Sequence, residues 1–247
     1  GILATDTQLT ATQSPYLITS TLQIPEGVIL RVDPGVELHS QVNDMFLVHG
    51  QLIAEGSANN EIVFDANGGN IFNGKFAGAA MLVSVNHASL RNGSSIWPAT
   101  GDANYGSLTL RNSQITDMSD YSYIWYPANN VLIEKNVFSN SAGFSIGFSS
   151  GTTDKVVVRN NRFVSKHPSL PDYMDYWIRN WACYCPDSLK VEFNSFLDDG
   201  IAVELESGHG STSLDAKNNY WGTNDEQVIA SKIYDQNDDI TTAGTIP

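Results

Sequence analysis

The stretch Val156-Val157-Val158-Arg159-Asn160-Asn161-Arg162-Phe163 decides the fold. A short run of β-branched residues leads into an asparagine, and a large aromatic residue follows two positions later. The same frame fits five other stretches: Val83–Leu90, Leu108–Ile115, Val131–Phe138, Leu189–Phe196 and Leu214–Trp221. In the first two of these, Ala88 and Ser113 take the place of the asparagine. The chain is therefore a repeat protein built from short strands.

The interval between asparagine positions is 23 to 25 residues, apart from one interval of 33. This period matches one coil of a parallel β-helix and is too short for most helical repeats. Asparagine tolerates the left-handed conformation, so we expect it at the bend between strands, hydrogen-bonded from coil to coil. The aromatic residues should stack in the interior: Phe138, Phe163, Phe196 and Trp221.

The pattern predicts one all-β domain over residues 1–247, a right-handed parallel β-helix solenoid. The interval of 33 predicts an inserted loop at about 164–175. Near the end, Thr223 and Glu226 have the spacing of a capping box, and an apolar stripe predicts a short helix over Asp225 to Ile233. A solenoid must cover its open end, so we expect a C-terminal cap at about 223–247.

Charge and composition limit the function. The formal net charge is −14 and 41% of residues are hydrophobic, which excludes wholesale disorder and argues against nucleic-acid partners. There is no run of about 18 apolar residues, so we expect no membrane insertion. No charged segment followed by an apolar stretch opens the sequence, which indicates a mature chain or an excised piece. We expect a secreted or cell-surface protein that is monomeric or a module of a larger chain.

Several segments resemble bacterial secreted right-handed β-helix repeat proteins of the pectate-lyase-like group. The opening segments that carry the resemblance are Ser14–Thr19, Ile24–Val28, Asp33–Leu38, Gly50–Ser57 and Ile62–Phe64. The closing segment Asn218–Thr223 is similar to the last coil of the same group. The resemblance covers nearly the whole chain and implies the fold. Its functional implication is broad, because the group includes polysaccharide lyases, glycoside hydrolases, epimerases and domains without assigned activity.

A second strand follows each asparagine bend, and its apolar centres align as Ile96, Ile124, Ile146, Ile178 and Val203. Side chains alternate across a strand, so the flanking residues should point outward. They include Trp97, Tyr123, Trp125 and Trp177, with Trp181 and Tyr184 close behind. Exposed aromatic rings in a row stack on sugar rings, so this pattern predicts a polysaccharide-binding face. The alternative is that these rings belong to the core, since a register error of one residue turns them inward.

Polar side chains beside this face suggest chemistry. Arg179, Glu204 and Asp199 are the candidate catalytic residues, because a lyase needs a cation and a base, and a glycoside hydrolase needs two carboxyl groups. The inserted loop should lie on this functional face. Asp198-Asp199-Gly200 and Gly208-His209-Gly210 superficially resemble polygalacturonase motifs, but here they fall within one coil, and the Arg-x-Lys motif is absent. The Asp-Pro-His signature of alginate epimerases is also absent. The alternative function is a non-catalytic adhesin or structural module.

Other candidate sites have simpler explanations. Cys183 and Cys185 are free thiols, a strained short-loop disulfide, or metal ligands with His167, whose spacing matches no zinc pattern. The acidic run Asp235 to Asp239 is a solvated loop or a Ca²⁺ site, so Ca²⁺ is the one cofactor considered and no other metal is expected. The aligned positions supply no flat threonine array, which argues against ice binding.

Overall fold

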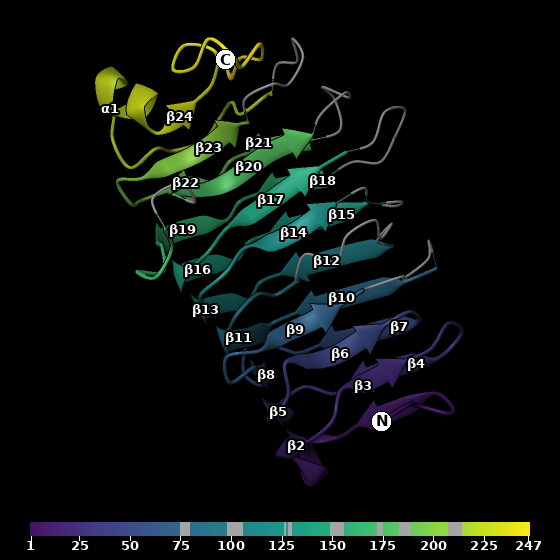
Figure 1. Ribbon diagram of the computed structural model, residues 1–247. Coiled ribbons are helices and arrows are strands. Elements are labelled where there is room, and N and C mark those ends of the chain that lie inside the picture. Colours follow the sequence, from purple (N-terminus) through teal and green to yellow (C-terminus); the bar gives the residue numbers. More distant parts are fainter. Residues whose placement is uncertain are drawn as a thin grey trace.

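Parallel strands stack into an elongated solenoid in the computed structural model, with the N-terminus at one end and the C-terminus at the other (Figure 1). The structure describes residues 1–74, 80–97, 106–125, 127, 130–148, 156–171, 175–182, 189–206 and 214–247, with the backbone alone for 181 and 182. The predicted parallel β-helix is confirmed.

Most coils contribute one strand to each of three sides of the solenoid, which we call the first, second and third sheets. The first sheet contains β1 (Thr7–Leu9), β4 (Ile29–Val32), β7 (Gln51–Glu55), β10 (Leu82–Asn86), β12 (Ser107–Arg111), β15 (Val131–Glu134), β18 (Val156–Arg159) and β21 (Leu189–Glu192). The second contains β2 (Tyr16–Ile18), β5 (Glu37–Ser40), β8 (Ile62–Asp65), β11 (Ala88–Gly93), β13 (Gln114–Met118), β16 (Val137–Ser141), β19 (Arg162–Ser165) and β22 (Ser195–Phe196). A short 3₁₀ helix, η1 (Ala11–Gln13), lies between β1 and β2.

The third sheet has two sections. The lower section contains β3 (Leu22–Ile24), β6 (Asp44–Val48) and β9 (Asn70–Asn73). The upper section contains β14 (Ser122–Trp125), β17 (Phe144–Gly147), β20 (Tyr176–Ala182), β23 (Ile201–Leu205) and β24 (Ile233–Tyr234). Residues 95–97 link the sections through backbone hydrogen bonds: the N–H of Phe72 donates to the Ile96 carbonyl, and that of Tyr123 donates to the Trp97 carbonyl.

The predicted asparagine ladder runs through the interior. Nδ2 of Asn136 donates to Oδ1 of Asn161 at 3.0 Å, and Asn161 donates in the same way to Asn194 at 3.0 Å. Asn194 continues the ladder to Asn219 at 3.1 Å. At the other end, the backbone N–H of Ser113 donates to Oδ1 of Asn136 at 3.0 Å. Each rung therefore satisfies polar groups of the next coil, and Asn136, Asn161 and Asn194 do so in the buried interior.

The predicted aromatic stack lies beside this ladder. The ring centroids of Phe138 and Phe163 are 4.9 Å apart, and those of Phe163 and Phe196 are also 4.9 Å apart, with interplanar angles of 17° and 5°. Trp221 ends the stack at 5.3 Å from Phe196. The three phenylalanines are fully buried. Their burial contributes to a continuous hydrophobic core that extends from Ile18 to Ile246.

One detail of the bend differs from expectation. The left-handed residue is the one before each ladder position: His87, Asn112, Lys135, Asn160, Phe193 and Asn218 have φ between 50° and 61°. Tolerance of positive φ therefore does not explain why asparagine occupies the ladder position. Asparagine suits this position because its side chain points inward and carries both a donor and an acceptor.

Phe193 occupies this strained position with an exposed ring. Its φ is 58° and 54% of the residue is accessible. Asparagine visits the left-handed region more readily than phenylalanine, so Phe193→Asn should raise the free energy of unfolding by about 1 kcal/mol in urea denaturation. The converse change at the equivalent position of the next coil, Asn218→Phe, should lower it by a similar amount. A decrease for Phe193→Asn would show that the exposed ring stabilises the coil more than the strain destabilises it.

The predicted short helix near the C-terminus is confirmed, but its N-cap differs from the prediction. The helix α1 spans Glu226–Ser231, and its N-cap is Asp225, whose carboxylate accepts from the N–H groups of Gln227 and Val228. Thr223 instead accepts from the N–H of Asp225, so the predicted capping box is wrong. The helix buries none of its residues. The tail after it contributes Ile246 to the hydrophobic core, so the tail rather than the helix covers the interior at this end.

Candidate functional site

Two parallel rows of residues cross the upper section of the third sheet. The register places Tyr123 beside Ser145, Ser145 beside Arg179, Arg179 beside Glu204, and Glu204 beside Tyr234. A parallel row pairs Trp125 with Gly147. We call these seven residues the outer row. Both aromatic residues of β14 thus lie beside a small residue of β17, a strand whose four residues are all buried.

Arg179 and Glu204, two of the three candidate catalytic residues, form an ion pair in this row. Nε of Arg179 lies 3.1 Å from Oε1 of Glu204, and Nη2 donates to Oε1 of Glu206 at 2.8 Å. The guanidinium carbon also lies 5.3 Å from the centre of the Tyr176 ring. Nε, Nη2 and one face of the guanidinium are therefore engaged within the protein.

The electrostatic environment of this group is unusual. Burial raises the pKa of Glu204 above its ordinary value, with a smaller contribution from Glu206, and the attraction of Arg179 opposes but does not cancel these effects. For Arg179, burial lowers the pKa, but Glu204 and Glu206 together outweigh burial, so the pKa is raised. Arg179 therefore stays charged, while Glu204 holds its proton more readily than an exposed glutamate does.

Tyrosines support the arginine from one side. Tyr121 and Tyr176 form a small cluster with Ala142, separate from the interior core, and the two tyrosine ring centroids are 4.3 Å apart. The Tyr121 hydroxyl donates to the Tyr176 carbonyl at 2.8 Å. Burial raises the pKa of Tyr176 to about 12. Neither tyrosine nor Glu206 was identified from the sequence, although Glu206 lies two residues after Glu204 and should share its face.

The inserted loop packs against this cluster. Leu170 contacts the tyrosines, and Lys166 forms ion pairs with Asp175 at 2.9 Å and Asp198 at 3.0 Å. Only 9% of the Lys166 side chain is accessible, and its Nζ lies 5.6 Å from the Trp177 ring centre. The described part of the loop is thus fixed to the edge of the third sheet, next to the outer row.

Two predicted surface aromatics are core residues instead. Trp97 is 2% exposed and Trp177 is 0% exposed. The Trp177 ring packs 4.9 Å from that of Phe163, and its Nε1 donates to Oδ1 of Asp198 at 2.6 Å. The expected outward orientation is wrong because Trp177 and Ile178, although consecutive in β20, both enter the interior core.

The remaining aromatic candidates have different positions. Tyr123 and Trp125 are half-buried, and their rings meet edge to face at 5.2 Å. Tyr123 packs against the tyrosine cluster, whereas Trp125 also touches the interior core. The side chain of Trp181 and the whole of Tyr184 lie outside the described residues, as do Cys183 and Cys185.

Asp199 is not part of the ion-pair group. It is exposed in the turn between β22 and β23, whereas the ion pairs of Arg179 are made by Glu204 and Glu206. Its neighbour Asp198 has a structural contact with Trp177 and Lys166. The carboxyl pair nearest to Arg179 is therefore Glu204 and Glu206 rather than Glu204 and Asp199.

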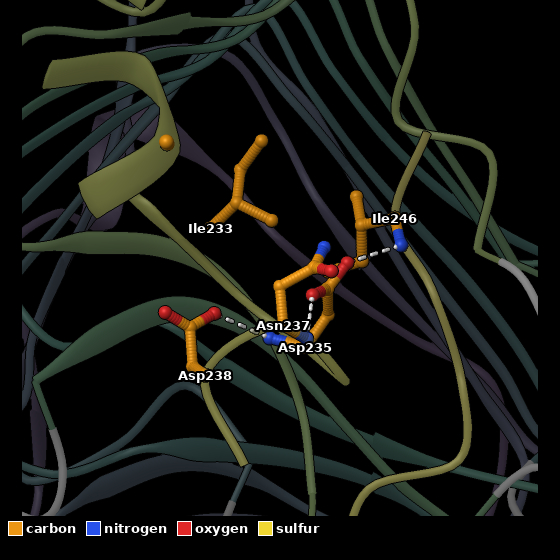
Figure 2. Close-up of a pocket in the computed structure, with 6 residues that line it drawn as sticks. Ile233, Asp235, Asn237, Asp238 and Ile246 are labelled. Carbon is orange, nitrogen blue, oxygen red and sulfur yellow. Dashed lines mark hydrogen bonds between the residues drawn. The ribbon is translucent and has the colours of Figure 1, made fainter. Parts of the chain in front are cut away.

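The acidic run near the C-terminus forms a folded turn beside a hollow that Figure 2 shows in close-up. The Asp235 carboxylate accepts from the backbone N–H groups of Asn237 and Ile246, both at 2.8 Å (Figure 2). Asp238 accepts from the N–H of Asp235 at 3.1 Å. Within the described ranges, no group of three or more His, Cys, Asp or Glu side chains is arranged to hold a metal ion.

Similarity to known proteins does not narrow the function. No family model, curated protein or solved structure matches this chain.

In the part of the chain that the structure describes, no helix has the length and apolar character needed to cross a membrane.

Proposed function

We propose that this protein binds a polysaccharide along the outer row of the third sheet. The observation that carries the proposal is the Tyr123–Trp125 pair beside the small residues Ser145 and Gly147. Both rings are half-buried, and their accessible parts can stack against pyranose faces. Arg179 and Glu204 continue the row as an ion pair, with 23% and 13% of their side chains accessible. A secreted or surface location is part of this proposal and agrees with the net charge of −14.

Cleavage of the bound glycan is a second candidate function. Glycoside hydrolysis uses one carboxylic acid that is protonated near the working pH and a second carboxylate nearby. The raised pKa of Glu204 suits the first role, and Glu206, held by the same arginine, is the candidate for the second. The alternative without chemistry is an adhesive or structural module.

Affinity electrophoresis against a panel of neutral, basic and acidic polysaccharides tests the binding proposal. Trp125→Ala should weaken the affinity for the glycan, measured as retardation, about tenfold, which is equivalent to about 1.4 kcal/mol. The reason is that the sugar loses the ring on which it stacks. Tyr123→Ala, whose ring lies outside the interior core, should act in the same direction without affecting folding as much. Phe193→Ala removes an exposed ring at the corner between the first and second sheets and is the matched control.

The outcomes separate the candidates. Retardation that depends on Tyr123 and Trp125 supports the binding face, and new reducing ends that disappear in Glu204→Gln support cleavage. Retardation unchanged in both aromatic variants contradicts the proposed location. No retardation by any polysaccharide contradicts glycan binding and favours the structural module.

A further inference from the structure

Tyr234 is the third aromatic residue of the outer row, and its ring is placed differently from the other two. Tyr123 packs against the tyrosine cluster and Trp125 against the interior core, whereas Tyr234 belongs to neither group. Its neighbour Ile233 takes the inward position on β24 and packs against the core. Among the residues that the structure describes, no aromatic ring stacks on Tyr234 and no cation lies over it. The half-buried Tyr234 ring therefore contributes little to the core.

The ring is nevertheless held in place. The Tyr234 hydroxyl donates to the Asp239 carboxylate. That carboxylate is fixed in turn, because it accepts from the backbone N–H of Thr241 at 2.9 Å and from the Thr241 hydroxyl at 2.8 Å. The backbone of Tyr234 pairs with that of Glu204 on β23. A side chain that is ordered before a ligand arrives loses little conformational freedom on binding, so this arrangement suits a contact residue.

The groups around Tyr234 are hydrogen-bond acceptors. Burial raises the pKa of Tyr234, and the carboxylates of Asp239, Glu204 and Asp238 raise it further, which places all three near its hydroxyl. Ionised carboxylates accept hydrogen bonds and donate none. A neutral sugar has apolar ring faces and an edge of hydroxyl donors, so a flat ring flanked by acceptors matches its chemistry.

Tyr234 lies at the opposite end of the row from Tyr123. The register runs from Tyr123 through Ser145, Arg179 and Glu204 to Tyr234, on the last strand of the sheet (Figure 1). These four strand steps give the row a length of about 19 Å, at about 4.8 Å for each step. One step is close to the length of one pyranose unit in an extended chain. A glycan that reaches both ends would therefore lie parallel to the solenoid axis and span about five units.

From these observations we infer that Tyr234 is a sugar-stacking residue, and that the outer row is an extended site for about five units of a neutral glycan. The inference rests on the proposed glycan-binding function. It adds the residue that bounds the site at the C-terminal cap, the length of chain that the site accepts and the class of sugar.

The test uses isothermal titration calorimetry with oligosaccharides of two to six units from four neutral series: cello-, xylo-, manno- and N-acetylchito-oligosaccharides. In a series that binds, the affinity should rise with chain length up to about five units and then level off. Tyr234→Leu keeps an apolar side chain but removes the flat ring. It should weaken binding of the hexasaccharide about tenfold, and the affinity should stop rising at a shorter chain.

Two further variants are the matched controls. Tyr234→Phe keeps the ring and loses only the hydrogen bond to Asp239, so it should bind the hexasaccharide within about twofold of the unmodified protein. Tyr220→Leu makes the same substitution at an exposed tyrosine that pairs with Ser195 of the second sheet, and it should leave binding unchanged. Urea denaturation checks that each variant is folded.

A second readout reports on the contact itself. With labelled tyrosine, the ring signals of Tyr234 in NMR spectra can be identified by their disappearance in Tyr234→Phe. These signals should shift when the hexasaccharide is added, whereas those of Tyr220 should not. This measurement uses the unmodified protein and therefore does not depend on how well Tyr234→Leu folds.

Each contrary result has a definite meaning. Unchanged hexasaccharide binding in Tyr234→Leu, or ring signals of Tyr234 that do not shift, would overturn the inference, and a loss of binding in Tyr123→Ala would still leave the proposed function standing. Equal weakening by Tyr234→Leu and Tyr234→Phe would overturn the stacking role, because the hydroxyl would then be responsible. Affinity that levels off at two units would overturn the extended site.

Two outcomes concern the class of sugar. Binding confined to the charged polysaccharides of the panel would overturn the neutral class and leave the proposed function standing. Absence of binding by all four series, together with a negative polysaccharide panel, would remove the proposed function itself.

Discussion

Replacing Asn161 with alanine should lower the free energy of unfolding by about 4 kcal/mol, because four hydrogen bonds are lost in a dry interior. The Asn161 Oδ1 accepts from the backbone N–H and from Nδ2 of Asn136, each at 3.0 Å. Its Nδ2 donates to the Ile133 carbonyl at 2.9 Å and to Asn194 Oδ1 at 3.0 Å. Urea denaturation followed by tryptophan fluorescence measures the loss.

Asn219 provides the matched control for this prediction. It makes similar bonds at the last rung, to the Val191 carbonyl and to Asn194, but it is half-buried. Water can replace part of what alanine removes there, so Asn219→Ala should cost about 1 to 2 kcal/mol. Equal losses at the two positions would show that burial does not set the strength of the ladder.

Lys166→Met should lower the free energy of unfolding by about 3 kcal/mol. Methionine keeps the length and apolar stem of lysine but removes the charge that Asp198 and Asp175 share. Only 15% of the Asp198 side chain is accessible, so that carboxylate would remain buried with little compensation, which is the costly way to break a buried ion pair. Asp175 is 49% accessible and can be hydrated.

Two further variants check that explanation. Lys190→Met, on an exposed part of β21, should change stability by less than about 0.5 kcal/mol. Asp175→Asn should cost about 1 kcal/mol, since Lys166 keeps Asp198 and the removed carboxylate faces water. If Asp175→Asn were as harmful as Lys166→Met, the loop contact rather than the buried Asp198 charge would be the source of stability.

The repeat could be predicted because its contacts recur at a fixed distance in the sequence. Asn136, Asn161 and Asn194 each bond to the equivalent residue of the next coil, so the same requirement selects the same residue at every turn. Phe138 and Phe163 stack for the same reason. The left-handed position was misassigned by one residue, because Lys135 and Phe193 occupy it without the composition that usually reveals positive φ.

The candidate site was predicted less completely because the coils are irregular there. Alignment by apolar centres placed Ile146 beside Ile178, whereas the register pairs Ile146 with Asn180 and Phe144 with Ile178. The register also shifts between Ile146 and Gly147. The neighbourhood of Arg179 and Glu204 was nevertheless predicted correctly. The expected alternation of inward and outward side chains does not hold at Trp177. Its inward orientation depends on contacts with Phe163 and Asp198, which are distant in the sequence.

The ladder also affects how a gene for this protein can change over evolutionary time. Because the rungs at Asn136, Asn161 and Asn194 are equivalent, duplicating or deleting the DNA of one complete turn brings together two surfaces that already fit. Such an event lengthens or shortens the molecule by about 4.8 Å, the spacing of adjacent strands. Selection on the length of the molecule can therefore act through insertion or deletion of whole turns. The residues that each turn exposes to solvent can change independently by point mutation.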